Sequence, residues 1–88
     1  MFKAIDVWKR RAGAGLVRYR CFQLIPENRY CVQSVDFYQL PFDEARIRKL
    51  ERQFLELLFE ESPDIRAETF ETVEEAIANH DLVFETEN

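Results

Sequence analysis

Five basic side chains are the residues of this sequence best suited to bind an anion. They are Lys9, Arg10, Arg11, Arg18 and Arg20. The first three precede a loop that holds Gly13 and Gly15, where the chain can turn sharply and point free backbone N–H groups at a phosphate. The last two alternate along one predicted strand and therefore share a face. The pattern predicts, as one alternative, a phosphate or nucleic-acid site.

The loop does not match either of two familiar phosphate motifs. A P-loop needs Gly-Lys followed by Ser or Thr, which is absent, and in the dinucleotide fingerprint Arg18 stands where the third glycine belongs. An ordinary solvated hairpin loop explains the same residues, so both interpretations stay open.

Nucleophilic and metal-ligating residues are few. The sequence has two cysteines, Cys21 and Cys31, and one histidine, His80, without a C-x-x-C spacing. We expect the cysteines to be diagonal neighbours on one sheet face, with Cα atoms ~7 Å apart or more, which is at the limit of an unstrained disulfide. The pattern predicts two buried free thiols, no catalytic residue, no metal site and no cofactor.

A hairpin from Leu16 to Leu40 must position most of these side chains. Its strands read LVRYRCFQLI and RYCVQSVDFYQL, joined by Pro26-Glu27-Asn28. A three-residue loop of this kind pairs Ile25 with Arg29 and holds its last residue in the left-handed conformation, which asparagine tolerates.

This register gives the hairpin two different faces. The inner, mostly apolar face sets Val17, Tyr19, Cys21 and Gln23 opposite Phe37, Val35, Gln33 and Cys31. The outer face pairs Arg18 with Asp36 and Arg20 with Ser34. Nearer the turn, the outer face sets Phe22 opposite Val32 and Leu24 opposite Tyr30. These last four side chains form an apolar patch with no evident cover, which makes them the candidate protein interface.

The segment from residue 2 to residue 9 fits a strand or a helix by periodicity. Its β-branched and aromatic residues favour a strand, which we expect to run antiparallel into the hairpin.

Two helices are predicted after the hairpin. Asp43 is a good N-cap for a long helix that Pro63 stops, and its apolar row should dock on the inner sheet face. That row contains Ile47, Leu50, Phe54 and Leu57. A short strand should follow over residues 65–70. Thr72 and Glu75 form a capping box, so a short second helix should begin at Val73 and end near Asn79.

Length and composition indicate one small domain over residues 1–88. The sequence is 47% hydrophobic with two Gly and three Pro, which favours a packed α+β domain over disorder. No apolar run approaches the roughly 20 residues that span a bilayer, and the first residues lack the apolar stretch of a signal peptide. We therefore expect no membrane contact and a cytoplasmic location.

Charge is divided unevenly along the chain. Residues 1–40 hold seven basic and three acidic residues, a net of +4, whereas residues 41–88 hold five basic and fourteen acidic residues, a net of −9. Unlike surfaces of this kind favour contacts with a partner or a second copy. The leading hypothesis is a non-enzymatic protein-interaction module, possibly a homodimer through the outer sheet face. The alternatives are the basic phosphate or nucleic-acid site and an acidic inhibitor that blocks a basic partner.

Overall fold

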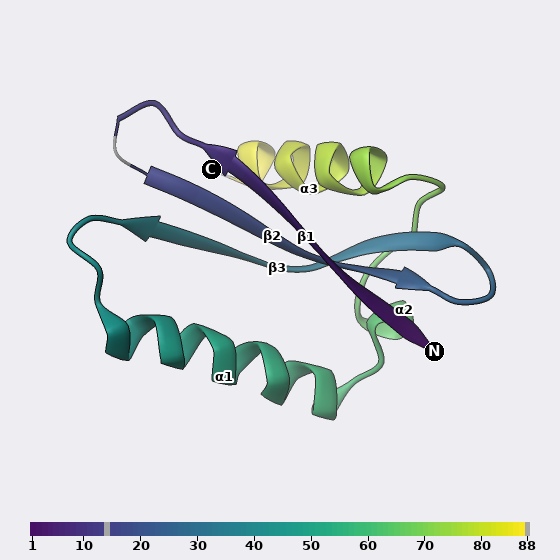
Figure 1. Ribbon diagram of the computed structural model, residues 1–88. Helices are drawn as coiled ribbons and strands as arrows, with labels where there is room; N and C mark the ends of the chain where they lie inside the picture. The colour runs from purple at the N-terminus through teal and green to yellow at the C-terminus, as the bar shows by residue number, and fades with distance from the viewer. Residues whose placement is uncertain (14, 88) are drawn as a thin grey trace.

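Three antiparallel strands form the centre of the molecule (Figure 1). The computed structural model describes residues 1–13 and 15–87, with residues 84–87 described by their backbone alone. The strands β1 (Phe2–Arg10), β2 (Gly15–Leu24) and β3 (Arg29–Gln39) lie in the order β1-β2-β3. The predicted α+β class and the three-stranded antiparallel sheet are confirmed, and the N-terminal segment is a strand.

The predicted hairpin register is correct over only part of the ladder. Val17 lies opposite Phe37 and Arg20 lies opposite Ser34, as expected, but a β-bulge follows and sets Cys21 opposite Val32. Gln33 is the extra residue on β3.

The hairpin turn also differs from the prediction. Leu24, and not Ile25, pairs with Arg29, so the turn spans the four residues 25–28. Asn28 takes the expected left-handed conformation, with φ at 56°. The bulge adds one residue to β3, and the turn is one residue longer than predicted. The observed register therefore differs from the predicted one by a single residue, and only between Cys21 and the turn.

The bulge redistributes side chains between the two faces. Phe22 lies opposite Cys31, so this cysteine shares a face with Phe22 and not with Cys21. Leu24 stays on the Phe22 face, whereas Val32 moves to the Cys21 face. Tyr30 moves to the Cys21 face as well, opposite Gln23. The prediction that the four interface candidates share one face is therefore wrong.

A helix covers each side of the sheet (Figure 1). On one side lies α1 (Glu44–Glu60), whose Phe54 contacts Phe22. On the other lies α3 (Val73–Glu87), whose Asp81 contacts Tyr19. We call these sides the α1 face and the α3 face. The long helix thus docks on the face predicted to be outer, and the C-terminal helix covers the face predicted to be inner.

The predicted helix starts are confirmed. The Asp43 carboxylate accepts the backbone N–H of Arg46 at 3.1 Å, and the Thr72 hydroxyl accepts that of Glu75 at 3.1 Å. The predicted end of the second helix at Asn79 is wrong, because α3 continues to Glu87.

The predicted strand over residues 65–70 is replaced by a helical turn, α2 (Pro63–Arg66). Proline at the first helical position favours such a turn. Only Phe70 bridges to the sheet, through two backbone hydrogen bonds with Tyr30 of 2.7 and 2.8 Å.

One cluster of the hydrophobic core lies under α3. Its buried members are Val17, Tyr19 and Cys21, and the partly buried residues around them are Ile5, Val7, Val32, Val35, Val73 and Ile77. In contrast, no residue of α1 is fully buried. None of the described helices is both long enough and apolar enough to cross a membrane.

Candidate functional site

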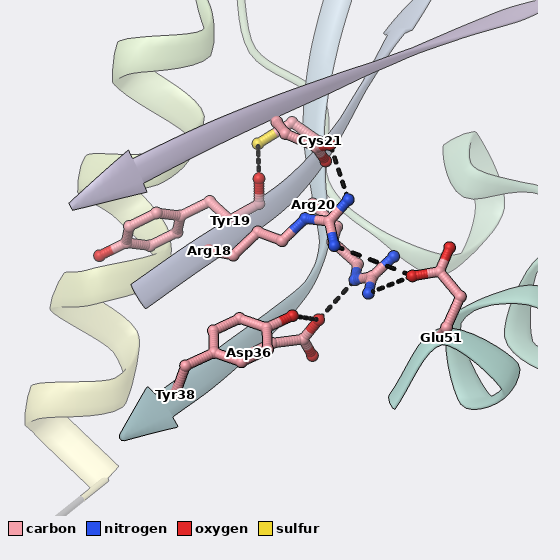
Figure 2. A network of polar contacts seen from close by, with 8 residues as sticks. Arg18, Tyr19, Arg20, Cys21, Asp36, Tyr38 and Glu51 are labelled. Atoms are coloured by element: carbon pink, nitrogen blue, oxygen red, sulfur yellow. Dashed lines mark hydrogen bonds and ion pairs between the residues drawn. The ribbon is translucent and has the colours of Figure 1, made fainter. Parts of the chain in front are cut away.

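Arg20 forms the centre of a charged network under α1 (Figure 2). Its side chain is buried, and its Nε lies 2.5 Å from the Asp36 carboxylate. A second guanidinium nitrogen lies 2.9 Å from Glu51 of α1, and the guanidinium carbon lies 4.6 Å from the centre of the Phe54 ring. Two carboxylates and an aromatic face together compensate for the loss of water around this cation.

Arg18 belongs to the same network but has different partners from those predicted. It lies opposite Asp36 in the ladder, yet its guanidinium binds Asp6 of β1 at 2.7 Å and lies 3.8 Å from Glu51. It also lies over the ring of Trp8, with 5.2 Å to the ring centre. Asp36 is used by Arg20 instead.

The ion pairs of this network shift the pKa values of Glu51 and Arg20. The hydrogen bond from Arg20 lowers the pKa of Glu51 below its usual value, although burial opposes this shift. Burial also acts to lower the pKa of Arg20, but its bonds to Glu51 and Asp36 outweigh burial and raise it. Arg20 and Glu51 are therefore charged at neutral pH, and the network joins β1, β2, β3 and α1.

The other three predicted anion-binding residues, Lys9, Arg10 and Arg11, are exposed at one end of the sheet. The Arg11 guanidinium lies over the ring of Phe37, with 5.3 Å to its centre. Lys9 borders a cavity on the α3 face, Arg10 borders a groove on the α1 face, and Arg11 borders both. The five basic residues therefore do not form one site.

The cavity beneath α3, which we call the α3 cavity, measures about 680 Å³. It is lined by strand residues including Tyr19 and Gln33, by His80 and Asp81 of α3, and by Arg66 of α2. Sites for small molecules commonly measure about 300–1,000 Å³.

Gln33 lines this cavity and has two polar side-chain atoms that lack hydrogen-bond partners among the described residues. The residue is 6% exposed, and the two atoms are its amide nitrogen and its amide oxygen. Leaving such a group unpaired costs about 1–3 kcal/mol. The residue is the bulge position, so its placement depends on the register shift in β3.

Tyr19 and His80 titrate abnormally beside the same cavity. Burial, reinforced by the hydrogen bond to Asp81 at 2.9 Å, raises the pKa of Tyr19 to about 12. Burial lowers the pKa of His80, against the opposing charge of Asp81. At neutral pH the phenol is a donor to Asp81, and the imidazole is predominantly uncharged.

The predicted apolar interface is not open. Phe22 and Leu24 are buried on the α1 face, and Tyr30 and Val32 are partly buried on the α3 face. The expectation of an uncovered patch at these four positions is wrong, because the bulge separates them onto two faces and Phe54 of the long helix packs on Phe22.

Exposed apolar side chains instead gather at the two ends of α1. Beside its N-terminus, Leu16, Leu40, Phe42 and Ile47 line two adjoining grooves of about 300 and 330 Å³. Near its C-terminus, Leu55 is 47% exposed and Phe59 is 90% exposed.

The thiols are protected from ionisation. Both cysteines are buried and free, and burial raises the pKa of Cys21 to about 12 and raises that of Cys31 as well. The prediction of two buried free thiols is confirmed. The described residues contain no group of three or more side chains that could hold a metal ion.

Sequence reasoning missed Gln33, Glu51 and Asp81 as site residues. Alternation along a strand carries no signal for a bulge, and Glu51 is one of many glutamates on α1. Asp81 directly follows the single histidine, which was the one available signal. Comparisons with protein-family models, with curated proteins and with solved structures return no match to this chain.

Proposed function

We propose that this protein is a non-enzymatic interaction module that pairs with a second copy of itself through the two ends of α1. The observation that carries the proposal is the 90% exposure of Phe59 at the C-terminal end of an amphipathic helix. Soluble monomers seldom expose large apolar side chains in clusters.

The two ends of α1 differ in charge. The grooves at the N-terminal end are lined by apolar side chains, by Asp43 and by three basic residues, Arg10, Arg11 and Arg46. The C-terminal end presents Leu55 and Phe59 next to acidic residues of the same helix and its cap, Glu56, Glu60 and Glu61. An apolar, acidic end therefore matches an apolar, basic groove.

Antiparallel pairing of two α1 helices satisfies both ends at once. The helix has 17 residues and is about 25 Å long, so both contacts fit along its length. A two-fold axis across the helix places each Phe59 in the groove of the other copy and closes the assembly at two subunits.

The surface area of the chain supports a partner of this size. A monomeric protein of 10.6 kDa is expected to expose about 5,500 Å². This chain exposes 6452 Å². The difference, about 1,000 Å², is close to the roughly 800 Å² that each partner buries in a stable interface of standard size.

Light scattering coupled to size exclusion tests this proposal. We expect the wild-type chain to run at about twice its mass of 10.6 kDa at micromolar concentration. Phe59→Glu should weaken self-association by about tenfold or more, equivalent to about 1.4 kcal/mol. The matched control is Leu82→Glu, which alters an exposed leucine of α3 and should leave the mass unchanged.

Tryptophan fluorescence provides a second measurement. Trp8 is the single tryptophan and is 53% exposed. The centre of its ring lies 5.7 Å from the ring centre of Tyr38, which borders both grooves. Its emission should shift to shorter wavelength as concentration rises, and Phe59→Glu should abolish the shift. A wild-type chain that stays monomeric at high micromolar concentration would contradict the proposal.

A further inference from the structure

The bulge in β3 places an amide beside the α3 cavity. Both polar atoms of Gln33 are buried without a partner among the described residues, and the residue lines the cavity. A glutamine amide sets an NH2 donor group beside a carbonyl acceptor, and the same pairing serves proteins that read the edge of a nucleobase.

Positive charge borders the same cavity from three parts of the chain. Lys9 lies on β1, Arg11 in the loop after it, and Arg66 at the end of α2. The one carboxylate in the lining, that of Asp81, accepts the Tyr19 hydroxyl. The lining therefore holds three cations against one anion, which favours an anionic ligand.

From these two observations we propose that the α3 cavity binds a nucleoside phosphate. The Gln33 amide pairs with the donor and acceptor edge of the base, and the cations at the rim hold the phosphate. Tyr19 and Phe37 add aromatic rings to the lining, and aromatic side chains favour contact with a planar base. The cavity volume of about 680 Å³ is within the range of small-molecule sites.

Gln33 distinguishes this site from the proposed dimer interface. The α3 cavity shares Arg11 and Phe37 with the grooves at the end of α1, but Gln33 and Arg66 do not border either groove. Gln33→Leu therefore tests the nucleotide proposal without altering the lining of the grooves, and Phe59→Glu tests the dimer without altering the lining of the cavity.

Titration of isotope-labelled protein with adenosine monophosphate tests the proposal directly. We expect saturable shifts of the Gln33 side-chain amide signals in nitrogen–proton correlation spectra. Ribose 5-phosphate, which lacks the base, should bind at least tenfold more weakly, and inorganic phosphate more weakly still.

Two variants and one control separate a binding role from a structural one. Gln33→Leu should weaken nucleotide binding at least tenfold while leaving the melting temperature the same or higher, because it removes an unpaired buried amide. Arg66→Gln should weaken binding of the nucleotide and of ribose 5-phosphate alike. Arg48→Gln, an exposed arginine of α1, should leave both affinities unchanged.

Three results would overturn the proposal. The first is an absence of Gln33 side-chain shifts at millimolar nucleotide. The second is equal affinity for inorganic phosphate and adenosine monophosphate, which would reveal a general anion site. The third is a lower melting temperature for Gln33→Leu with unchanged binding, which would assign the amide to folding alone.

Discussion

The ring of Phe54 on α1 stacks on the ring of Phe22 on β2, with 5.7 Å between the ring centres and 13° between the planes. The Arg20 guanidinium lies over the same Phe54 ring at 4.6 Å. Phe54 therefore contributes to both the apolar and the charged contacts that hold α1 against the sheet.

Phe54→Ala should destabilise the protein by about 3 kcal/mol, because it removes the stack and leaves a cavity beside Arg20. Urea unfolding followed by circular dichroism gives the change in the free energy of unfolding. Gln53→Ala, one residue earlier and exposed on α1, is the control and should cost less than about 1 kcal/mol. Equal losses for the two variants would mean that the helix docks by another face.

Asp36→Asn should lower the free energy of unfolding by about 3 kcal/mol, since it leaves the buried Arg20 guanidinium with only its partly exposed partner Glu51. Asp6→Asn breaks the more exposed pair with Arg18 and should cost about 1 kcal/mol or less. Denaturant unfolding of both variants checks the difference. A smaller loss for Asp36→Asn than for Asp6→Asn would reverse our assignment of the buried pair.

Thiol reagents should react slowly with the folded protein at pH 8. The pKa of Cys21 is raised to about 12 and both cysteines are buried, so almost no accessible thiolate exists at that pH. Labelling monitored by mass spectrometry should become fast only in denaturant. Rapid labelling of Cys21 in the native state would show that α3 does not cover this part of the sheet.

Stability should decline as the pH falls below about 6.5, partly through His80. Burial lowers the pKa of His80 in the folded state, so the unfolded chain binds a proton at higher pH than the folded chain does. The contribution of the neutral His80 imidazole to the free energy of unfolding is fully present above the unfolded-state pKa. It is lost as the pH falls through the folded-state pKa. Thermal melts of His80→Gln should show a flatter decline as the pH falls below about 6.5, and an unchanged slope would contradict the burial of the imidazole.

The sequence was informative where local chemistry decides the structure. The Asp43 cap, the Thr72 cap and the left-handed Asn28 each depend on a few neighbouring residues, and all three were predictable. The register from Val17 to Arg20 also followed, because alternation of polar and apolar side chains persists there.

Structural features that depend on contacts between distant parts of the chain were not predictable. Both sheet faces carry apolar residues, so the pattern could not determine which helix covers which face. The bulge at Gln33 is compensated at the turn, and therefore leaves the ends of the hairpin in plausible alternation. The Arg20 network requires Glu51, which lies 31 residues further along the chain. The α3 cavity and the grooves at the end of α1 depend on these long-range contacts, so neither could be located from the sequence.

The strand order β1-β2-β3 has a consequence for the order of events during synthesis. Each strand pairs with its neighbour in sequence, and the whole sheet lies within residues 2–39. Contacts between sequence neighbours close small loops and form early. The meander can therefore assemble while α1 and α3 are still being translated, with both of its faces exposed to water. In that interval Phe22 and Leu24 are accessible to chaperones, and the arrival of α1 ends the exposure by stacking Phe54 onto Phe22.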